Sequence, residues 1–164
     1  MKFKIFVLFL AATFALTSCG SDKKKEDATT KTSEKKEEVK KEEPTTPFDE
    51  TKPTLDNKGI GPIKSVTLDA LDEGMAAKGK ELFKANCTAC HKIKKKYIGP
   101  ALKGVTKRRS SEWIMNMILN PDEMLANDPV AKALITKYNA PMAKQILTEE
   151  EVRSILEYFR LKDK

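Results

Sequence analysis

The sequence predicts an all-α domain of about one hundred residues, preceded by a polar linker and an export signal. Two observations support the helical class. After residue 67, apolar residues recur at the spacing of one helix face, and capping residues or prolines bound these segments. No run of β-branched residues requires a strand. We therefore expect three parts, with boundaries 1–18, 19–62 and 63–164.

Residues 1–18 have the character of a secretory signal. Lys2 and Lys4 precede an apolar run over 5–16, which is too short to span a bilayer as a helix. The run ends in Leu-Thr-Ser-Cys, which resembles the lipobox of bacterial lipoproteins. That resemblance implies cleavage before Cys19 and attachment of lipid to its sulfur. We expect a protein that is exported, anchored by lipid to a bacterial membrane, and facing the periplasm. The alternative is ordinary secretion with an incidental Cys19.

Residues 19–62 are predicted to be a disordered tether. The stretch 20–60 holds ten basic and eleven acidic residues, arranged in alternating Lys and Glu blocks and followed by threonines and prolines. Such a segment has too few apolar residues to offset the entropy of ordering the chain. It would give the following domain reach along one membrane, or serve only as a spacer.

Four helical segments and one C-terminal helix are expected in the domain. The first covers 68–83, and the second covers 110–119 with Ser110 as its N-cap. Shorter helices are expected over 121–125 and 130–138.

The last helix begins after Thr148. Glu151 lies three residues on, which completes a capping box. An apolar stripe then follows at helical spacing, made of Val152, Ile155, Leu156 and Phe159.

The decisive motif is Cys87-Thr88-Ala89-Cys90-His91, a C-x-x-C-H run. In an exported protein this run is typical of covalent c-type haem attachment. Two thiols three positions apart can reach the two vinyl groups of one haem, and the adjacent imidazole can bind the iron. His91 is the only histidine in the chain, so any second protein ligand must be another residue type.

Three other interpretations of the motif are weaker. A zinc site needs about four ligands, and Cys19 lies far from the other two cysteines. A redox C-x-x-C would accompany a βαβ pattern, which is not found. A structural disulfide between Cys87 and Cys90 would leave His91 unexplained.

Over its last hundred residues the chain resembles the class I monohaem cytochromes c. The matching features, in chain order, are Gly79-x-x-x-Phe83, the C-x-x-C-H run, Ile98-Gly99-Pro100-Ala101-Leu102, a methionine on a loop, and a capped last helix ending in Leu156-Glu157-Tyr158-Phe159. The resemblance implies one covalent haem c packed within the helices. It implies that the first and last helices cross at Gly79, with Phe83 near Tyr158. It also implies that the carbonyl of Pro100 accepts a hydrogen bond from the ring of His91.

The resemblance places the sixth iron ligand at Met142, on the loop before the last helix. This loop departs from the family pattern, because Pro141 precedes the methionine and the stretch 120–138 replaces a simpler loop. Met124 stays open as a competitor, as does a site without a protein ligand. Met115 and Met117 lie on the same predicted helix as Trp113 and are expected to pack in the core.

The domain is basic, with nineteen basic and thirteen acidic residues from residue 61 onward. Five lysines follow the haem motif and the Gly-Pro segment and are expected to ring the haem edge: Lys92, Lys94, Lys95, Lys96 and Lys103. Such a ring would steer the domain onto acidic faces of redox proteins. A generic solvated surface, or attraction to anionic lipid, is the alternative. Nucleic acid is not an expected partner.

We therefore expect a membrane-tethered carrier of single electrons that is not an enzyme. Expected partners are a quinol-oxidising complex and a terminal oxidase or another reductase. Two alternatives stay open. One is a haem peroxidase or gas sensor with a displaceable sixth ligand, although the chain has no second histidine to act as an acid–base group. The other is a fixed haem subunit of a respiratory complex.

Overall fold

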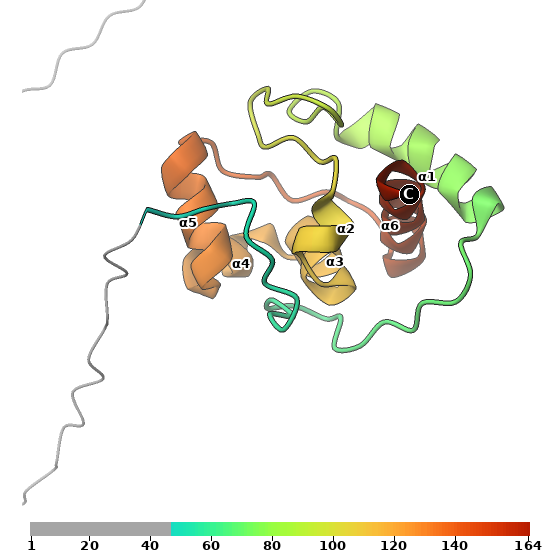
Figure 1. Cartoon of the computed structure of the whole chain (residues 1–164), viewed down its shortest axis with the longest axis horizontal. Helices are drawn as coiled ribbons and strands as arrows, with labels where there is room; N and C mark the ends of the chain where they lie inside the picture. The colour runs from blue at the N-terminus through green and yellow to red at the C-terminus, as the bar shows by residue number, and fades with distance from the viewer. Residues whose placement is uncertain (1–46) are drawn as a thin grey trace, which may run out of the picture. The chain divides into compact units, whose positions relative to one another are not determined.

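The computed structural model describes residues 47–164, and helices account for all of their regular structure (Figure 1). The six helices are α1 (Glu73–Asn86), α2 (Val105–Arg108), α3 (Ser111–Leu119), α4 (Pro121–Asn127), α5 (Pro129–Tyr138) and α6 (Glu149–Asp163). Within the described residues there is no strand, only an isolated bridge between Thr54 and Arg109. The prediction of an all-α fold is confirmed.

Helices α1 and α6 cross, and Gly79 lies at the crossing point (Figure 1). A Cβ atom at Gly79 would overlap the backbone carbonyl of Ser154 on α6, so only glycine permits this approach. The rings of Phe83 and Tyr158 lie 5.5 Å apart beside the crossing. The expected crossing and the expected aromatic pair are both present.

The start of the first helix differs from the prediction. Helix α1 begins at Glu73 instead of residue 68, because the Asp72 side chain accepts a hydrogen bond from the Met75 amide at 2.8 Å and caps the helix there. Periodicity alone extended the predicted helix into residues 68–72, which lie outside any helix in the fold.

The last helix follows the prediction closely. Thr148 and Glu151 form the capping box, with the Thr148 amide donating to the Glu151 carboxylate at 2.9 Å. All four residues of the predicted stripe are 4% exposed or less. Burying each of these side chains contributes roughly 1.5–3 kcal/mol, so α6 is fixed mainly by its apolar face.

Helices α3, α4 and α5 also occur where they were expected, with shifted ends. Ser110 accepts the Trp113 amide at 3.1 Å and caps α3. Helix α4 ends at Asn127, two residues later than predicted. Helix α5 starts at Pro129, one residue earlier than predicted, and Asp128 is its N-cap. The one-turn helix α2 was not predicted; it follows Gly104, whose φ is 77°.

The predicted boundary at residue 62 is too late. Residues 47–67, which we call the strap, pack along α3 and past α5 toward α1 (Figure 1). Few apolar side chains hold the strap, namely Phe48, Ile60, Ile63 and Val66. Side chains of the helices instead bind its backbone, which is why composition predicted disorder for residues 47–62.

Asn116 provides the strongest of these attachments. It is 1% exposed, and its amide donates to the carbonyls of Lys58 and Ile63 at 3.0 and 2.9 Å. Its oxygen accepts the Ile63 amide at 2.9 Å. One side chain therefore satisfies three backbone groups of the strap.

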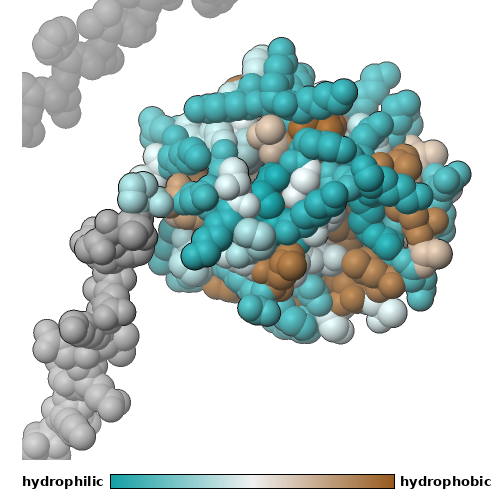
Figure 2. Space-filling view, viewed as in Figure 1, coloured by the Kyte–Doolittle hydropathy of each residue, from teal (hydrophilic) through white to brown (hydrophobic). Residues whose placement is uncertain are grey.

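The other predictions for the N-terminal part concern residues outside the described range: the signal over 1–18, lipidation of Cys19 and the tether over 19–46. Within residues 47–164, no helix is long and apolar enough to cross a membrane. The face shown in Figure 2 is mostly hydrophilic, with hydrophobic side chains in scattered groups.

Candidate functional site

The C-x-x-C-H motif forms the turn that follows α1. Cys87 caps the helix, its amide bonding to the Phe83 carbonyl at 2.9 Å. The amides of Cys90 and His91 both bond to the Cys87 carbonyl, at 3.1 and 2.9 Å. This tight turn places Cys87 and Cys90 on the wall of one cavity together with His91.

The thiols are free, and Cys87 is buried while Cys90 is exposed. No disulfide joins them, and the part of the chain that is described has no cluster of three His, Cys, Asp or Glu able to hold a metal ion. Before a haem is attached, burial, followed by the charge of Cys90, raises the pKa of the Cys87 thiol to about 11.

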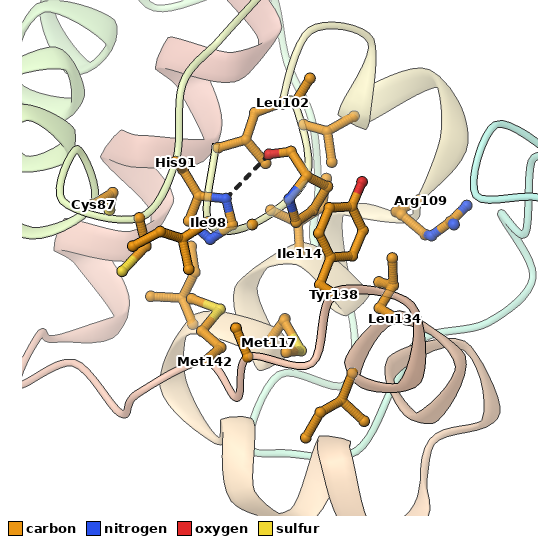
Figure 3. Close-up of a pocket in the computed structure, with 18 of the residues that line it drawn as sticks. Cys87, His91, Ile98, Leu102, Arg109, Ile114, Met117, Leu134, Tyr138 and Met142 are labelled. Carbon is orange, nitrogen blue, oxygen red and sulfur yellow. Dashed lines mark hydrogen bonds between the residues drawn. The ribbon is translucent and has the colours of Figure 1, made fainter. Parts of the chain in front are cut away.

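The ring of His91 is held by the Gly99-Pro100 segment. Its Nδ1 lies 3.2 Å from the Pro100 carbonyl oxygen, to which Nδ1–H donates (Figure 3). A Cβ atom on Gly99 would overlap the ring, so this glycine allows the Gly-Pro segment to lie against it. Burial lowers the pKa of His91, and the bond to Pro100 offsets this only in part. The imidazole is neutral, with Nε2 free to bind a metal.

Met142 lines the same cavity as His91 and reaches it from the loop between α5 and α6 (Figure 3). That loop begins at Asn139, which ends α5 with a left-handed φ of 50°. Met124, the competing candidate, does not line the cavity: it is fully buried, and its sulfur accepts the Ile60 amide at 3.0 Å. The structure thus places His91 and Met142 in the wall of one cavity, whereas Met124 on α4 contacts the strap.

Met117 also lines the cavity, which the sequence analysis did not predict. Met115 is buried in the core as expected, but Met117 is only half-buried and points into the cavity near Met142 (Figure 3). The two residues are two positions apart on α3, so they face different sides of the helix. This spacing was the sequence signal that could have shown that Met115 and Met117 do not share one environment.

The sequence analysis also did not predict that one wall of the cavity is polar. Glu50 of the strap, Arg109 and Tyr138 line it, and the Tyr138 hydroxyl donates to Glu50 at 2.7 Å. Arg109 is 4% exposed and packs over the Trp113 ring at 5.7 Å. Burial and the bond to Glu50 raise the pKa of Tyr138 to about 12, so its phenol stays protonated.

The five predicted docking lysines occupy different settings. Lys94, Lys95 and Lys96 are exposed on the loop after His91, and Lys96 lies 4.9 Å from the Tyr138 ring centre. Lys92 is half-buried and donates to the Thr88 carbonyl at 2.7 Å. Lys103 donates to the Lys162 carbonyl at the end of α6. Lys103 is exposed as well, so four of the five lysines are accessible to solvent; partner docking stays a prediction.

The chemistry of the cavity fits a haem. Its other walls are largely apolar, with Ile98, Leu102, Ile114, Leu134 and Phe159 among the lining residues. Two thiols stand at one edge, a neutral imidazole is oriented by a backbone carbonyl, and a thioether lies in the same space. These are the groups that attach a haem and ligate its iron.

Comparison with known proteins agrees with this geometry. The family model described as Cytochrome c matches residues 76–161. The chain is 46% identical to a solved cytochrome c from Rhodothermus marinus, with a TM-score of 0.61, covering 62% of this chain and 89% of that one. It is likewise 46% identical to an engineered Rhodothermus marinus cytochrome c bound to a carbene intermediate, with a TM-score of 0.58 and coverage of 62% and 89%.

A curated relative, a cytochrome c-553-like protein of Synechocystis, is 43% identical over 49 residues. This match covers 29% of the chain and 47% of the relative, so the chain spans about half the length of the curated relative it matches.

Proposed function

The chain belongs to the cytochrome c family, and from this premise we propose that it is a membrane-tethered carrier of single electrons between respiratory partners. As a member of that family it is an electron-transfer haem protein with one covalent haem c, for which Cys87 and Cys90 have the required spacing. The proposal adds the identity of the axial ligands, the tether and the class of partner.

The observation that carries the proposal is that His91 and Met142 line one apolar cavity (Figure 3). Haem supplies, when bound, an iron that cycles between two oxidation states. In our proposal His91 would hold that iron through Nε2 and Met142 would hold it through its thioether sulfur. A thioether ligand would favour the reduced iron relative to a second imidazole, which suits a carrier of single electrons.

The other residues act by fixing these ligands. Pro100 holds the His91 ring in one orientation and one tautomer, which favours binding through Nε2. Cys87 and Cys90 bind the haem edge from the turn after α1.

The proposals about the tether and the partners are based mainly on the sequence. We propose that Cys19 is lipidated, that residues 19–46 link the lipid to the domain, and that the protein faces the periplasm. Exposed Lys94, Lys95 and Lys96 support encounters with acidic redox proteins, such as a quinol-oxidising complex or a terminal oxidase. Replacing Cys19 by Ser should move the protein from the membrane fraction to the soluble periplasmic fraction; unchanged membrane association would contradict the lipid anchor.

The ligand assignment is tested by the optical spectrum of the dithionite-reduced protein before and after carbon monoxide is added. We expect no change, because Met142 holds the sixth position. A shift to a carbonyl spectrum would mean that the position is open or its ligand displaceable, and would favour a peroxidase or gas sensor. A matched Met142→Ala variant should bind carbon monoxide, while Met124→Leu should not.

Mobility is tested by purification in mild detergent. A carrier should elute alone, whereas a fixed subunit of a respiratory complex would co-purify with partners in constant stoichiometry.

A further inference from the structure

Glu50 is a carboxylate at the wall of the haem cavity, and the proposed function gives it no role. It belongs to the strap, lines the same cavity as Cys87 and His91, and its side chain is 27% exposed. Its two oxygens have separate partners on α5. Oε2 accepts the Tyr138 hydroxyl at 2.7 Å, and Oε1 lies 3.4 Å from Lys137 Nζ.

The backbone around Glu50 is held in place. Buried Arg109 donates to the carbonyl of Glu50 at 3.1 Å and to that of Lys52 at 2.9 Å. Arg109 is itself fixed over the Trp113 ring. The carboxylate therefore has a defined position relative to the cavity and is not a mobile surface charge.

The charges that surround Glu50 do not cancel it fully. Tyr138 is neutral, since its raised pKa keeps the phenol protonated. Lys137 is 39% exposed, so water screens part of its attraction for Glu50. The guanidinium of Arg109 donates to backbone carbonyls and also attracts Glu50, Arg108 lines the same cavity, and Lys96 lies over the Tyr138 ring. The Glu50 carboxylate therefore makes a negative contribution to the electrostatic potential in the cavity, which these basic groups offset in part, and such contributions are stronger in an apolar cavity than in water.

We propose that Glu50 tunes the reduction potential of the haem, its negative charge favouring the oxidised iron and holding the potential down. The inference rests on the proposed electron-carrier function, because only there does the potential matter. The oxidised iron carries one more positive charge than the reduced iron, so a nearby carboxylate stabilises it preferentially. The segment that follows the predicted tether would then set a property of the redox centre.

A role in structure alone predicts the opposite sign. If Glu50 only fastened the strap, losing it would admit water to the cavity, and a more exposed haem favours the charged oxidised state. The potential would then fall. Losing the charge while the strap stays in place should raise it, so the sign of the shift separates the two roles.

The experiment is an equilibrium redox titration of the full-length, haem-loaded protein and its variants. Glu50→Gln keeps an oxygen to accept the Tyr138 hydroxyl and should raise the potential. Asp56→Asn removes the same charge from an exposed position on the strap and should leave the potential unchanged. Glu50→Asp keeps the charge and should stay close to the parent protein. Tyr138→Phe keeps the Glu50 charge and should not raise the potential.

An unchanged or lowered potential in Glu50→Gln would overturn the inference, as would an equal rise in Asp56→Asn or in Tyr138→Phe. The carbon monoxide spectrum is recorded on each variant. A carbonyl shift in the parent protein would overturn the ligand assignment of the proposed function and leave the Glu50 comparison measurable, so the two failures are distinguishable.

Discussion

The α1–α6 crossing and the strap are held in different ways. Helices α1 and α6 meet through apolar side chains and a glycine contact, with the rings of Phe83, Tyr158 and Phe159 packed together in tilted and edge-to-face arrangements beside it. The strap has few buried apolar residues, and polar side chains of α3 and of the Arg109–Ser110 turn bind its backbone. Apolar burial leaves a periodic signal in the sequence of the buried segment, whereas backbone binding leaves none. The crossing was therefore predicted and the strap was not.

The largest effect is expected from Gly79→Val, which places a side chain against the Ser154 carbonyl. Because that neighbour is backbone, the helices must separate, and the free energy of unfolding should fall by about 3 kcal/mol or more. Thermal unfolding of the haem-loaded protein measures it. The control is Gly74→Val on the same helix, where a Cβ meets only the Asp72 side chain. Equal losses in the two variants would show that helix propensity, and not the crossing, sets the cost.

The strap should be loosened by Asn116→Ala, which removes three hydrogen bonds to its backbone. We expect a loss of about 2–3 kcal/mol, since buried backbone groups lose their partners. Hydrogen exchange should quicken at the Ile63 amide while the α1 and α6 amides keep their protection relative to global unfolding. Asn127→Ala, at an exposed residue, is the control. Uniform quickening across the domain would mean that the strap has no separate stability.

Glu157 connects the two regions. It is fully buried on α6 and pairs with Arg153 and Arg160, which donate to the strap carbonyl of Thr67 and to that of Asp69 just beyond it. Desolvation raises its pKa, but the bonds from both arginines outweigh this, and the pKa lies below its usual value of 4.5.

A depressed folded-state pKa means that Glu157 stabilises the fold above its unfolded pKa. This contribution is lost as the pH falls through the lower folded value. The melting temperature should therefore drop in acid, and Glu157→Gln should show a smaller drop below about pH 4.5. The measurement is the melting temperature against pH for both proteins. Parallel curves would mean that other carboxylates cause the acid loss.

The smallest effect is expected from Thr148→Ala, which removes the capping box of α6. The cap lies on an exposed turn, so the cost should be about 1 kcal/mol. Thr148→Ser keeps the oxygen that accepts the Glu151 amide and should restore most of the stability. A loss as large as that of Asn116→Ala would indicate that α6 depends on its cap more than on its apolar face.

The residues of the site also separate into those that the sequence identified and those that only the tertiary structure revealed. Cys87, Cys90, His91 and Pro100 lie within fourteen residues, so a local motif and a family resemblance identify them. Met142 was assigned by its place in the family pattern, and the structure adds that Met124 is engaged by the strap. Glu50, Arg109 and Tyr138 come from distant segments and carried no local signal, whereas the only signal for Met117 was its spacing from Met115 on α3.

The sequence by itself determined the helical class, the haem-binding turn and the apolar face of α6, because each depends on residues within a few turns of one another. Only the tertiary structure decided where the domain begins and what surrounds the iron site. Residues 47–62 look disordered by composition, since the partners of their backbone lie about fifty residues or more away on α3 and its neighbours. Those partners exist only once the helices have packed, and the same packing brings Glu50 to the cavity wall.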